Sequence, residues 1–427
     1  MHTHREFMIG KDLQVLRDMT NIAVIGSGIS GLSASYILSK QEKINIDLYE
    51  KESRLGGHTH THELNLYGDT IRVDSGFIVF NQHNYPNLLK LFKELNVEIN
   101  DSSMSFSYNS ISSAWSSEDY KKLSSIANKS YLRRLIEIIR FKRLALITKD
   151  ELSNSTLGSW LIDHNFSNEF TQEYVVPMAA SIWSSNFDVI REFPFKTFVE
   201  FYDNHQLFNL LKRPQWKSVN NGSSTYIEKM QTQWGVKNIF LNAKLEINFQ
   251  DKFFILNNGI EKSYDMVIFA CHANQIKTIF PKIDTFLGTS LLNEFSYSQN
   301  LVSIHTDESV MPLNKNQWSS WNIQQLNQKF FLTYWMNNLQ KLDTNHNIFV
   351  SVGDNARISR EKLINSFTYQ HPIYNSKSVM AQNAITKFQG NNGIYLVGAY
   401  LGYGFHEDGL NSAIKVAQTI TKDLNVF

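Results

Sequence analysis

The sequence predicts an α/β fold built on a parallel, Rossmann-type sheet, and three observations lead to that prediction. Near the N-terminus a β-branched strand, residues 21–25, runs into a glycine-rich turn and then a helical stretch. A second strand follows and ends in the acid Glu50. Near the C-terminus another strand runs into a second glycine-rich loop and a helix. This order of elements is typical of a dinucleotide-binding domain.

The first turn contains Gly26, Gly28 and Gly31, and each of these positions requires glycine for a different structural reason. The first makes the tight turn, the second lets the backbone approach a pyrophosphate, and the third lets the following helix lie close to the strand. The helix is expected over residues 32–40, with the free N–H groups of its N-terminus facing the anion. A glycine pattern alone is weak, but both flanking elements are present here.

The second strand is expected over residues 44–49 and ends at Glu50, nineteen residues after Gly31. An acid at this position accepts hydrogen bonds from an adenosine ribose and favours a free 2′-hydroxyl over a 2′-phosphate. A second pair, Gly56 and Gly57, follows closely, with Arg54 beside it as a charge partner for the pyrophosphate.

Two further segments favour FAD over NAD. Residues 73–77 form a small-residue turn, which is what a main chain needs where it passes a flat ring system. A strand at residues 394–397 then leads through a glycine-rich loop into a helix over residues 413–424. The N–H groups of this loop are placed to stabilise negative charge on a reduced flavin. NAD has no need of such a distant segment, whereas the isoalloxazine of FAD lies far from its adenine.

Seven segments together resemble a known family: RLGGHTHT, DSGFIVFNQHNYPNL, PMAASIW, RPQWKSVNNGSSTYIEKM, VIFACHANQ, LTYWMNNLQ and GAYLGYGFHEDGLNSA. They are similar to the FAD-dependent flavoproteins of the amine-oxidase and phytoene-desaturase superfamily. More narrowly, they resemble the branch of NAD/FAD-binding proteins associated with cyclopropane-fatty-acid-synthase-like methyltransferases. The resemblance runs from about residue 21 to the C-terminus.

This resemblance implies a discontinuous FAD-binding Rossmann domain of the glutathione-reductase type, interrupted by a mixed α/β substrate domain. Residues 1–19 are expected to be an N-terminal extension. The FAD domain is assigned to residues 20–98, 217–290 and 390–427, and the substrate domain to residues 99–216 and 291–389. Within the second FAD piece we expect a strand over residues 239–249, a hairpin over 253–260 and a buried strand ending at Ala270.

The predicted cofactor-binding residues come from the turns named above, and the resemblance adds the main chain near Leu245 at the adenine. They are Gly26, Ser27, Gly28, Ile29, Ser30, Gly31, Glu50, Lys51, Arg54, Gly56, Gly57, His58, Asp74, Ser75, Gly76, Phe77, Leu245, Ala270, Gly398, Ala399, Gly404, His406, Gly409 and Leu410. Tyr403 and His406 are the candidate catalytic residues. An apolar substrate pocket is expected near the flavin, and the candidate residues of its wall are Trp183, Trp335, Tyr400, Tyr403 and Phe405.

Composition and sequence pattern argue against several classes of protein. The chain has 427 residues with a net charge near +1, so it lacks the basic excess that a nucleic-acid binder shows. The sequence contains no run of eighteen apolar residues, so no membrane-spanning helix is predicted. The N-terminus is too polar for a signal peptide. A single cysteine, Cys271, fits a reducing cytoplasm. Aromatic residues make up 13% of the chain and favour a well-filled core or, in the substrate domain, an apolar cavity.

Four features have two interpretations. His58, His60 and His62 alternate as metal ligands on one face of a strand do, but no acidic or cysteine fourth ligand is evident for that face, so no metal is predicted. Residues 131–149 interleave basic and apolar side chains, which fits either an ordinary solvated helix or an interfacial helix on the inner membrane face. Cys271 is either a small core residue or a flavin attachment point. Asp408 and its neighbours are either helix caps or proton carriers.

The leading functional hypothesis is an FAD-dependent oxidoreductase that exchanges a hydride with flavin N5 on an apolar substrate, an unsaturated or branched fatty acyl chain. One alternative is a flavin-dependent double-bond isomerase without net redox. Another is a non-catalytic flavoprotein that partners a lipid methyltransferase. Amine oxidation is the third alternative, although LTYWMNNLQ lacks the lysine that the superfamily's amine oxidases commonly place near flavin N5.

Overall fold

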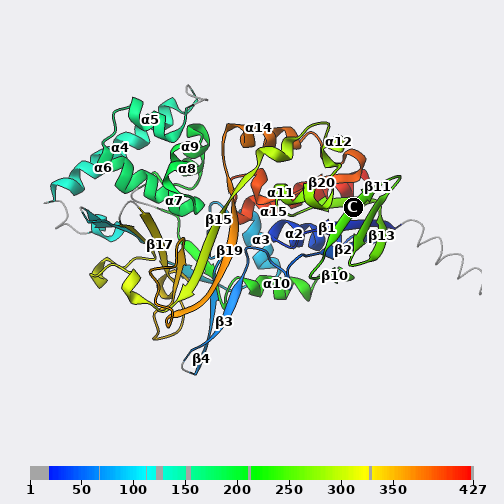
Figure 1. Ribbon diagram of the computed structural model, residues 1–427, viewed down its shortest axis with the longest axis horizontal. Coiled ribbons are helices and arrows are strands. Elements are labelled where there is room, and N and C mark those ends of the chain that lie inside the picture. The colour runs from blue at the N-terminus through cyan, green and yellow to red at the C-terminus, as the bar shows by residue number, and fades with distance from the viewer. Residues whose placement is uncertain are drawn as a thin grey trace, which may run out of the picture. The chain divides into compact units, whose positions relative to one another are not determined.

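The computed structural model describes residues 19–424 except 67, 112, 122–127, 151–154, 210–212 and 327–328 (Figure 1). The predicted N-terminal extension, apart from Met19, lies outside the described residues. The chain divides into two compact units. The first comprises Met1–Gly57, Tyr226–Phe295 and Met380–Phe427, and the second comprises His58–Thr225 and Ser296–Val379.

The first unit is built on a five-stranded sheet in which every neighbouring pair is parallel. Such strands are buried on both faces, and β1 meets that requirement with a continuous apolar run in which Ile22, Ala23 and Val24 are fully buried. In spatial order the strands are β10 (Asn238–Phe240), β2 (Ile44–Tyr49), β1 (Thr20–Ile25), β14 (Met266–Phe269) and β20 (Ile394–Leu396).

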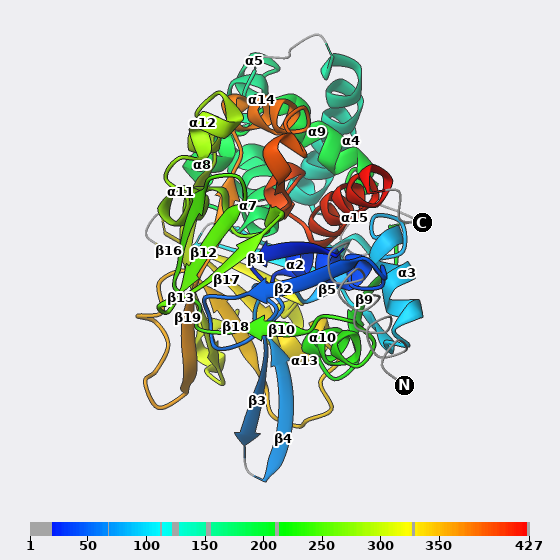
Figure 2. The ribbon, with the colours of Figure 1, turned by 90° about the vertical axis from the view of Figure 1, so that its right-hand side faces the viewer.

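Helices from distant parts of the chain accompany this sheet. Figure 2 shows α2 and α15 side by side next to the parallel strands. The helices of this unit are α2 (Ile29–Leu38), α11 (Ala273–Ile279), α12 (Ile283–Leu287) and α15 (His406–Asp423). Two more, α10 (Ser224–Gln231) and α14 (Ser376–Ile385), cross the boundaries between the units. Both α2 and α15 begin earlier than expected, by three and seven residues, because their glycines take helical geometry.

The strand expected over residues 239–249 is wrong, because the structure divides it into two strands. Its first part is β10, which pairs with β2 in the parallel sheet. Its second part is β11 (Leu245–Phe249), which pairs with β12 (Phe253–Asn257) in a separate antiparallel sheet completed by β13 (Ile260–Tyr264). The chain turns between them at Asn242, which has a left-handed backbone with φ +54°. Short apolar runs carry no signal for such a change of sheet.

The second unit contains three sheets. The largest has seven strands and is antiparallel except where β16 pairs with β7. Its strands, in spatial order, are β19 (Leu363–Ile373), β15 (Ser296–His305), β18 (Phe349–Val352), β17 (Lys329–Trp335), β16 (Trp321–Leu326), β7 (Phe106–Asn109) and β8 (Ala114–Ser116). The smaller sheets are β3 (Thr61–Leu66) with β4 (Asp69–Asp74), and β5 (Val79–Asn81), β9 (Trp216–Val219) and β6 (Ile99–Ser102).

The helices of the second unit enclose an aromatic core. Trp160 is fully buried and stacks on Phe195 at 4.3 Å between ring centroids, and Phe141 contacts Trp160 edge-on at 5.6 Å. The helices are α3 (Pro86–Glu94), α4 (Lys129–Thr148), α5 (Leu157–Asp163), α6 (Asn168–Phe170), a π-helical turn (Thr171–Val175), α7 (Val176–Trp183), α8 (Phe187–Arg191), α9 (Phe195–Asn204) and α13 (Met336–Leu339). None of the helices in the described part of the chain has both the length and the apolar character needed to cross a bilayer.

The boundaries of the two compact units differ from the predicted domain boundaries. Residues 58–98 were assigned to the FAD domain, but they belong to the second unit. The other limits differ by ten residues or fewer: the first unit resumes at Tyr226 and Met380, where residues 217 and 390 were expected. Compactness and cofactor binding are separate properties, so the predicted FAD domain stays a prediction.

The aromatic core yields a stability prediction. Trp160→Ala removes the stacked ring and the hydrogen bond from its Nε1 to Oγ1 of Thr148 at 3.0 Å. We expect the free energy of unfolding to fall by about 3 to 5 kcal/mol, since the surrounding rings cannot close the cavity. Ile162→Ala, on the same helix but 76% exposed, is the matched control and should change it by less than about 0.5 kcal/mol. Equal losses in urea unfolding would contradict this account of the core.

Candidate functional site

Four turns meet at one edge of the parallel sheet in the first unit. Gly26 follows β1, Glu50 follows β2, Ala270 follows β14, and Gly398 lies two residues after β20. These strands are parallel neighbours, so their carboxyl ends share an edge. Ligands of open α/β sheets bind outside this edge. The structure therefore brings together residues that are up to 372 positions apart in the sequence.

The first turn is shaped by close backbone contacts. Gly26 has φ +104°, and its N–H donates to the carbonyl of Tyr49 at 2.8 Å. A Cβ on Gly31 would lie 1.8 Å from the carbonyl oxygen of Gly26 and 3.0 Å from Cβ of Ala270. Only glycine fits this contact, so Gly31 allows α2 to lie against β1 and β14, as predicted. Ala270 packs there as a small neighbour.

Gly28 differs from the other two glycines. Its backbone is extended, with φ −64° and ψ 178°, and no atom lies within 4 Å of the Cβ that it lacks. It forms the N-cap of α2 without a side chain that could accept from the first-turn N–H groups of Ile29, Ser30 and Gly31. A helix N-terminus with open space beside an uncapped backbone suits an anion. The turn thus fits the pyrophosphate of a dinucleotide.

Glu50 lies beside this turn and is 6% exposed. Its Oε2 accepts from the N–H of Ser27 at 2.8 Å and from the Ser27 hydroxyl at 2.6 Å, and its Oε1 accepts from the N–H of Glu52 at 2.9 Å. An ionised carboxylate has about four acceptor positions, so one remains for a ribose hydroxyl. The role of Ser27 in orienting the acid was not visible in the sequence. Lys51 lies on the surface and forms an ion pair with Glu52.

The second glycine pair packs directly onto the first turn. The N–H of Gly56 donates to the carbonyl of Ser27 at 2.9 Å, and a Cβ on Gly57 would lie 3.2 Å from Cα of Gly28. Both glycines have positive φ, at +113° and +56°. Arg54 donates to the carbonyls of Leu55 and Gly57 at 3.2 and 2.8 Å, so its guanidinium holds the loop. Its contact with a pyrophosphate stays a prediction.

The C-terminal loop reaches the same place. A Cβ on Gly409 would lie 2.7 Å from Oγ of Ser30 and 2.8 Å from Cγ2 of Ile29, so the first turn of α15 packs on the first turn of α2. Gly398 donates its N–H to Oγ of Ser412 at 3.0 Å, and Gly404 donates to the carbonyl of Ala399 at 3.1 Å. Leu410 is buried in α15. Leu245 begins β11 in the neighbouring antiparallel sheet of this unit.

Burial shifts the pKa values of two titratable groups of this loop, His406 and Asp408, in opposite directions. Burial lowers the pKa of His406 to about 3, so its imidazole stays neutral. Burial raises the pKa of Asp408 to about 6, while its Oδ2 accepts from the N–H of Phe405 at 3.0 Å. A general base is most effective with a pKa near the working pH. The hydrogen bond fits the cap interpretation of Asp408, and its pKa leaves the proton-carrier interpretation open. Catalysis by His406 or half-buried Tyr403 stays a prediction.

Cys271 follows Ala270 on the same strand end. Loss of solvation raises the pKa of its thiol to about 12. A thiolate is the reactive form, and at this pKa it is scarce at neutral pH. The raised pKa disfavours a reactive thiolate, and the side chain is half-buried, so neither interpretation of Cys271 is decided.

In the second unit, Asp74 has a structural role. It is fully buried, and its carboxylate accepts from Thr61 Oγ1 at 2.5 Å and from the N–H and hydroxyl of Ser223, each at 2.9 Å. Burial raises its pKa to about 6. A Cβ on Gly76 would lie 2.1 Å from the carbonyl oxygen of His58, so the fold alone requires this glycine. The approach of this turn to a flat ring system stays a prediction.

The alternating histidines join a hydrogen-bonded network in this unit. His62 Nε2 lies 2.8 Å from the Ser75 hydroxyl, which lies 2.7 Å from the Tyr369 hydroxyl, and that hydroxyl lies 2.9 Å from His60 Nδ1. The His58 ring packs on Tyr369 at 5.1 Å. Within the described residues, no three side chains of the metal-binding types gather closely enough to hold an ion.

The candidate pocket aromatics pack against other side chains. Trp183 is 6% exposed and contacts Phe193 and Phe201, each at 4.6 Å between ring centroids. Trp335 donates from Nε1 to Asn347 at 3.0 Å. Tyr400 is buried against Phe295 at 4.9 Å, and its ring covers Gly398. These aromatic residues thus fill cores, which is what composition alone favoured. The apolar pocket stays a prediction, and so does the place of half-buried Phe405 in its wall. The place of buried Phe77 in the cofactor site also stays a prediction.

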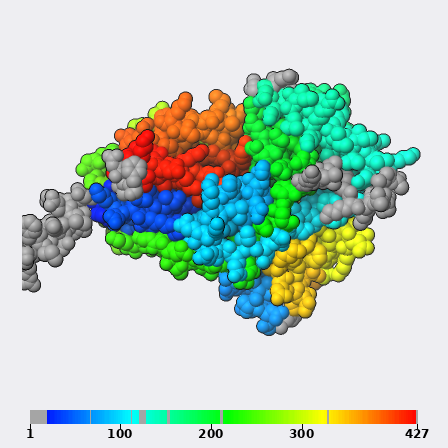
Figure 3. All heavy atoms as spheres, turned by 180° about the vertical axis from the view of Figure 1, so that it is seen from behind, coloured from blue at the N-terminus to red at the C-terminus, as the bar shows by residue number. Residues whose placement is uncertain are grey.

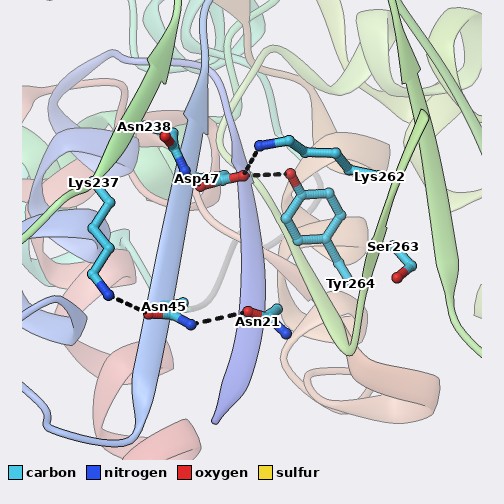
Figure 4. A pocket seen from close by; sticks show the side chains of 8 residues that line it. All are labelled: Asn21, Asn45, Asp47, Lys237, Asn238, Lys262, Ser263 and Tyr264. Atoms are coloured by element: carbon cyan, nitrogen blue, oxygen red, sulfur yellow. Dashed lines mark hydrogen bonds and ion pairs between the residues drawn. The ribbon is translucent and has the colours of Figure 1, made fainter. Parts of the chain in front are cut away.

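A polar cavity of about 330 Å³ lies at the opposite edge of the parallel sheet (Figure 4). Asp47 at its centre accepts from Lys262 at 3.1 Å, Tyr264 at 2.7 Å and Asn238 at 2.6 Å. It lies near the amino ends of the strands, and its polar groups bond to one another, so it does not suit the dinucleotide. Its lining residues are Asn21, Asn45, Asp47, Lys237, Asn238, Lys262, Ser263 and Tyr264.

The contrast between Gly28 and Gly31 is testable. In protein stripped of small molecules, Gly31→Ala should lower the free energy of unfolding by more than about 2 kcal/mol, because the new methyl group overlaps the Gly26 carbonyl. Gly28→Ala should change it by less than about 1 kcal/mol, because its backbone suits alanine and the methyl group meets open space. Urea unfolding of both variants checks this, and similar losses would contradict the assignment of Gly28 to a ligand.

The buried carboxyl of Asp408 predicts a pH effect. The folded state holds its proton up to about pH 6, whereas the unfolded state releases it near 3.8, so the wild type loses stability as pH rises through this window. Asp408→Asn lacks this loss, and from pH 4 to 7 its unfolding free energy should gain about 2 to 3 kcal/mol relative to the wild type. Exposed Asp251→Asn is the control. A difference that stays constant with pH would refute the burial argument.

Comparison with known proteins agrees with this geometry. Residues 24–95 match the family model of an NAD(P)-binding Rossmann-like domain. Flavin-containing amine oxidase A from Bos taurus is 36% identical over 80 residues, and the dog protein matches equally. That match covers 19% of this chain and 14% of the bovine protein. The chain therefore spans a small part of the curated relatives that it matches.

Solved structures match over almost the whole chain. Putrescine oxidase has a TM-score of 0.68 at 14% identity, covering 95% of this chain and 99% of its own. Cyclohexylamine oxidase from Brevibacterium oxydans has 0.69 at 14%, covering 95% and 100%. A conjugated-linoleic-acid-producing fatty acid isomerase from P. acnes has 0.68 at 12%, covering 94% and 98%. The chain thus shares the fold of these solved structures, and its residues 24–95 match an NAD(P)-binding Rossmann-like domain.

Proposed function

We propose that this protein is an FAD-dependent oxidoreductase whose substrate is apolar, an unsaturated or branched fatty acyl chain. The observation that carries the proposal is the meeting of four turns at the carboxyl edge of the parallel sheet, with open space at Gly28. The comparisons support flavin chemistry, since the relatives and neighbours include flavin-containing oxidases.

Each turn has a part in holding the cofactor. The first turn of α2 receives the pyrophosphate at Gly28, and the remaining acceptor position of Glu50 receives a ribose hydroxyl. Main chain near Leu245 contacts the adenine. The loop from Gly398 to Gly409 contacts the flavin end, which explains why a segment near the C-terminus packs on α2. FAD, when bound, supplies the hydride-accepting N5.

The rest of the protein orients the substrate and excludes water. Because a buried methylene contributes about 0.8 kcal/mol, a long acyl chain can supply most of its own binding energy without a charged anchor. The fatty acid isomerase among the structural neighbours supports an acyl substrate, and it equally favours the second candidate, a double-bond isomerase without net redox. The amine oxidases among the neighbours make amine oxidation the third.

The identity of the substrate is decided by one anaerobic panel. Unsaturated or methyl-branched acyl lipids should bleach the visible absorbance of the bound flavin, because hydride transfer reduces it, whereas putrescine and cyclohexylamine should not. Stopped-flow spectra record the bleaching. Bleaching by amines and by no acyl lipid would overturn the acyl proposal and leave the flavoprotein assignment intact.

A second measurement separates oxidoreductase from isomerase. An oxidoreductase consumes one equivalent of an electron acceptor for each product, whereas an isomerase returns the hydride and consumes none. Acyl product formed without acceptor would establish the isomerase. A flavoprotein that is silent in both measurements would point to the non-catalytic partner of a methyltransferase.

A further inference from the structure

The longest helix among the described residues, α4, combines a buried face with an unusual outer face. It has 20 residues and is capped by Asn128, whose side chain accepts from the N–H of Ser130 at 3.0 Å. Its inner face buries Ile138, Phe141 and Ala145, and Phe141 contacts Phe166 at 5.7 Å and Phe198 at 6.2 Å. The helix is therefore anchored in the second unit, beside α5 and α6 (Figure 1).

The outer face carries large apolar side chains in contact with water. Leu132 is 38% exposed, Ile136 65%, Ile139 58% and Ile147 59%. Their spacings of four, three and eight residues place them in one stripe along the helix. They are four of the eleven large apolar side chains that are exposed in the described part of the chain. In the space-filling view the turquoise segment that includes α4 reaches the molecular surface (Figure 3).

Basic side chains share this stripe. Lys129, Arg133 and Arg143 are exposed on the same side. We call these three residues, together with Leu132, Ile136, Ile139 and Ile147, the α4 face. At 1.5 Å per residue the face extends over about 27 Å, which suits a helix lying flat on a surface.

The α4 face contains no acidic residue. The single acidic residue of the helix is Glu137, which lies outside the α4 face. Its carboxylate accepts hydrogen bonds from the N–H of Ser167 at 2.9 Å and from the Ser167 hydroxyl at 2.7 Å. Glu169 reaches one end of the face, where its Oε2 lies 3.7 Å from Nη1 of Arg133. The charge is therefore positive along a stripe that is also apolar.

We propose that the α4 face docks on an anionic lipid surface. The isoleucines insert among the acyl chains near the headgroups, and the lysine and arginines bind lipid phosphates. The occupant must be both apolar and anionic over some 27 Å, a combination that an anionic bilayer provides along its whole surface. The inference rests on the exposure and charge of α4 and is independent of the substrate proposal.

Flotation of the purified full-length protein with vesicles tests the proposal. The protein should bind vesicles of phosphatidylcholine with phosphatidylglycerol and should bind pure phosphatidylcholine much more weakly. High salt should reduce binding, since it screens the interaction with phosphates. Binding that ignores both lipid charge and salt, or no binding to either vesicle, would overturn the proposal.

Variants locate the contact. Ile136→Asp with Ile139→Asp should weaken partitioning by at least about tenfold, because apolar burial is lost. Lys129→Glu with Arg143→Glu should abolish the preference for anionic vesicles. Matched controls are Leu313→Asp, at a fully exposed apolar site, and Arg360→Glu, at an exposed basic site; both should bind as the wild type does.

One further measurement distinguishes lipid from protein as the occupant. Light scattering after size exclusion gives the oligomeric state of the wild type and of the α4 variants. The proposal predicts the same state for all of them, with unchanged flavin content. A wild-type oligomer that the α4 variants dissociate, without vesicle binding, would assign the face to a second copy of the chain instead.

Discussion

The contact between Gly31 and the carbonyl oxygen of Gly26 is the constraint on which the candidate site depends. A missing Cβ allows α2 to approach β1 and β14 closely enough for the first turn to close. Two other glycine contacts build on it: Gly57 lies on Gly28, and Gly409 lies on the first turn of α2. At Gly31 and Gly57 the space of a side chain is occupied by backbone, and at Gly409 it is occupied by the side chains of Ile29 and Ser30. We call these three packed segments the cradle: the turn at residues 26–31, the loop at Gly56 and Gly57, and the first turn of α15. Within the first turn of the cradle, Gly28 has open space beside it.

Electrostatics then gives this cradle its chemistry. The N-terminus of α2 presents uncapped N–H groups, and Glu50 stands beside them, held by Ser27. A positive helix end with a buried acid beside it matches the phosphate and the ribose of a nucleotide. The same loop explains why acid and anion do not conflict, since the N–H of Ser27 satisfies the carboxylate directly.

The sequence predicted the elements whose signals are local. The turn at residues 26–31, the strand ending at Glu50 and the strand beginning at Ile394 are all present, because glycine spacing and β-branched runs report local geometry. The break at Asn242 was missed because both strands have similar composition. Gly76 and Asp74 were assigned to the cofactor, and the structure shows that they also contact His58 and Ser223, so their cofactor role stays a prediction. Contacts between distant segments leave no periodic pattern, so a glycine that faces a ligand looks like one that faces backbone.

The aromatic residues illustrate the same limit. Their number indicated either a full core or a cavity, and only coordinates separate these outcomes. Rings such as Trp160 and Trp183 are packed at 4 to 5 Å from their neighbours. The helix predicted over residues 131–149 is present as α4, but the sequence could not show which of its sides the fold would bury.

The measurement that tests the central claim most directly is a titration of flavin-stripped protein with FAD, FMN and NAD, followed by flavin fluorescence and calorimetry. The cradle described here recognises the adenosine and pyrophosphate half, and the C-terminal loop requires a second, distant half. FAD should therefore saturate at about one equivalent per chain. FMN, which lacks the adenosine half, and NAD, which lacks the isoalloxazine, should bind far more weakly. Equal affinity for FMN, or preference for NAD, would contradict the account.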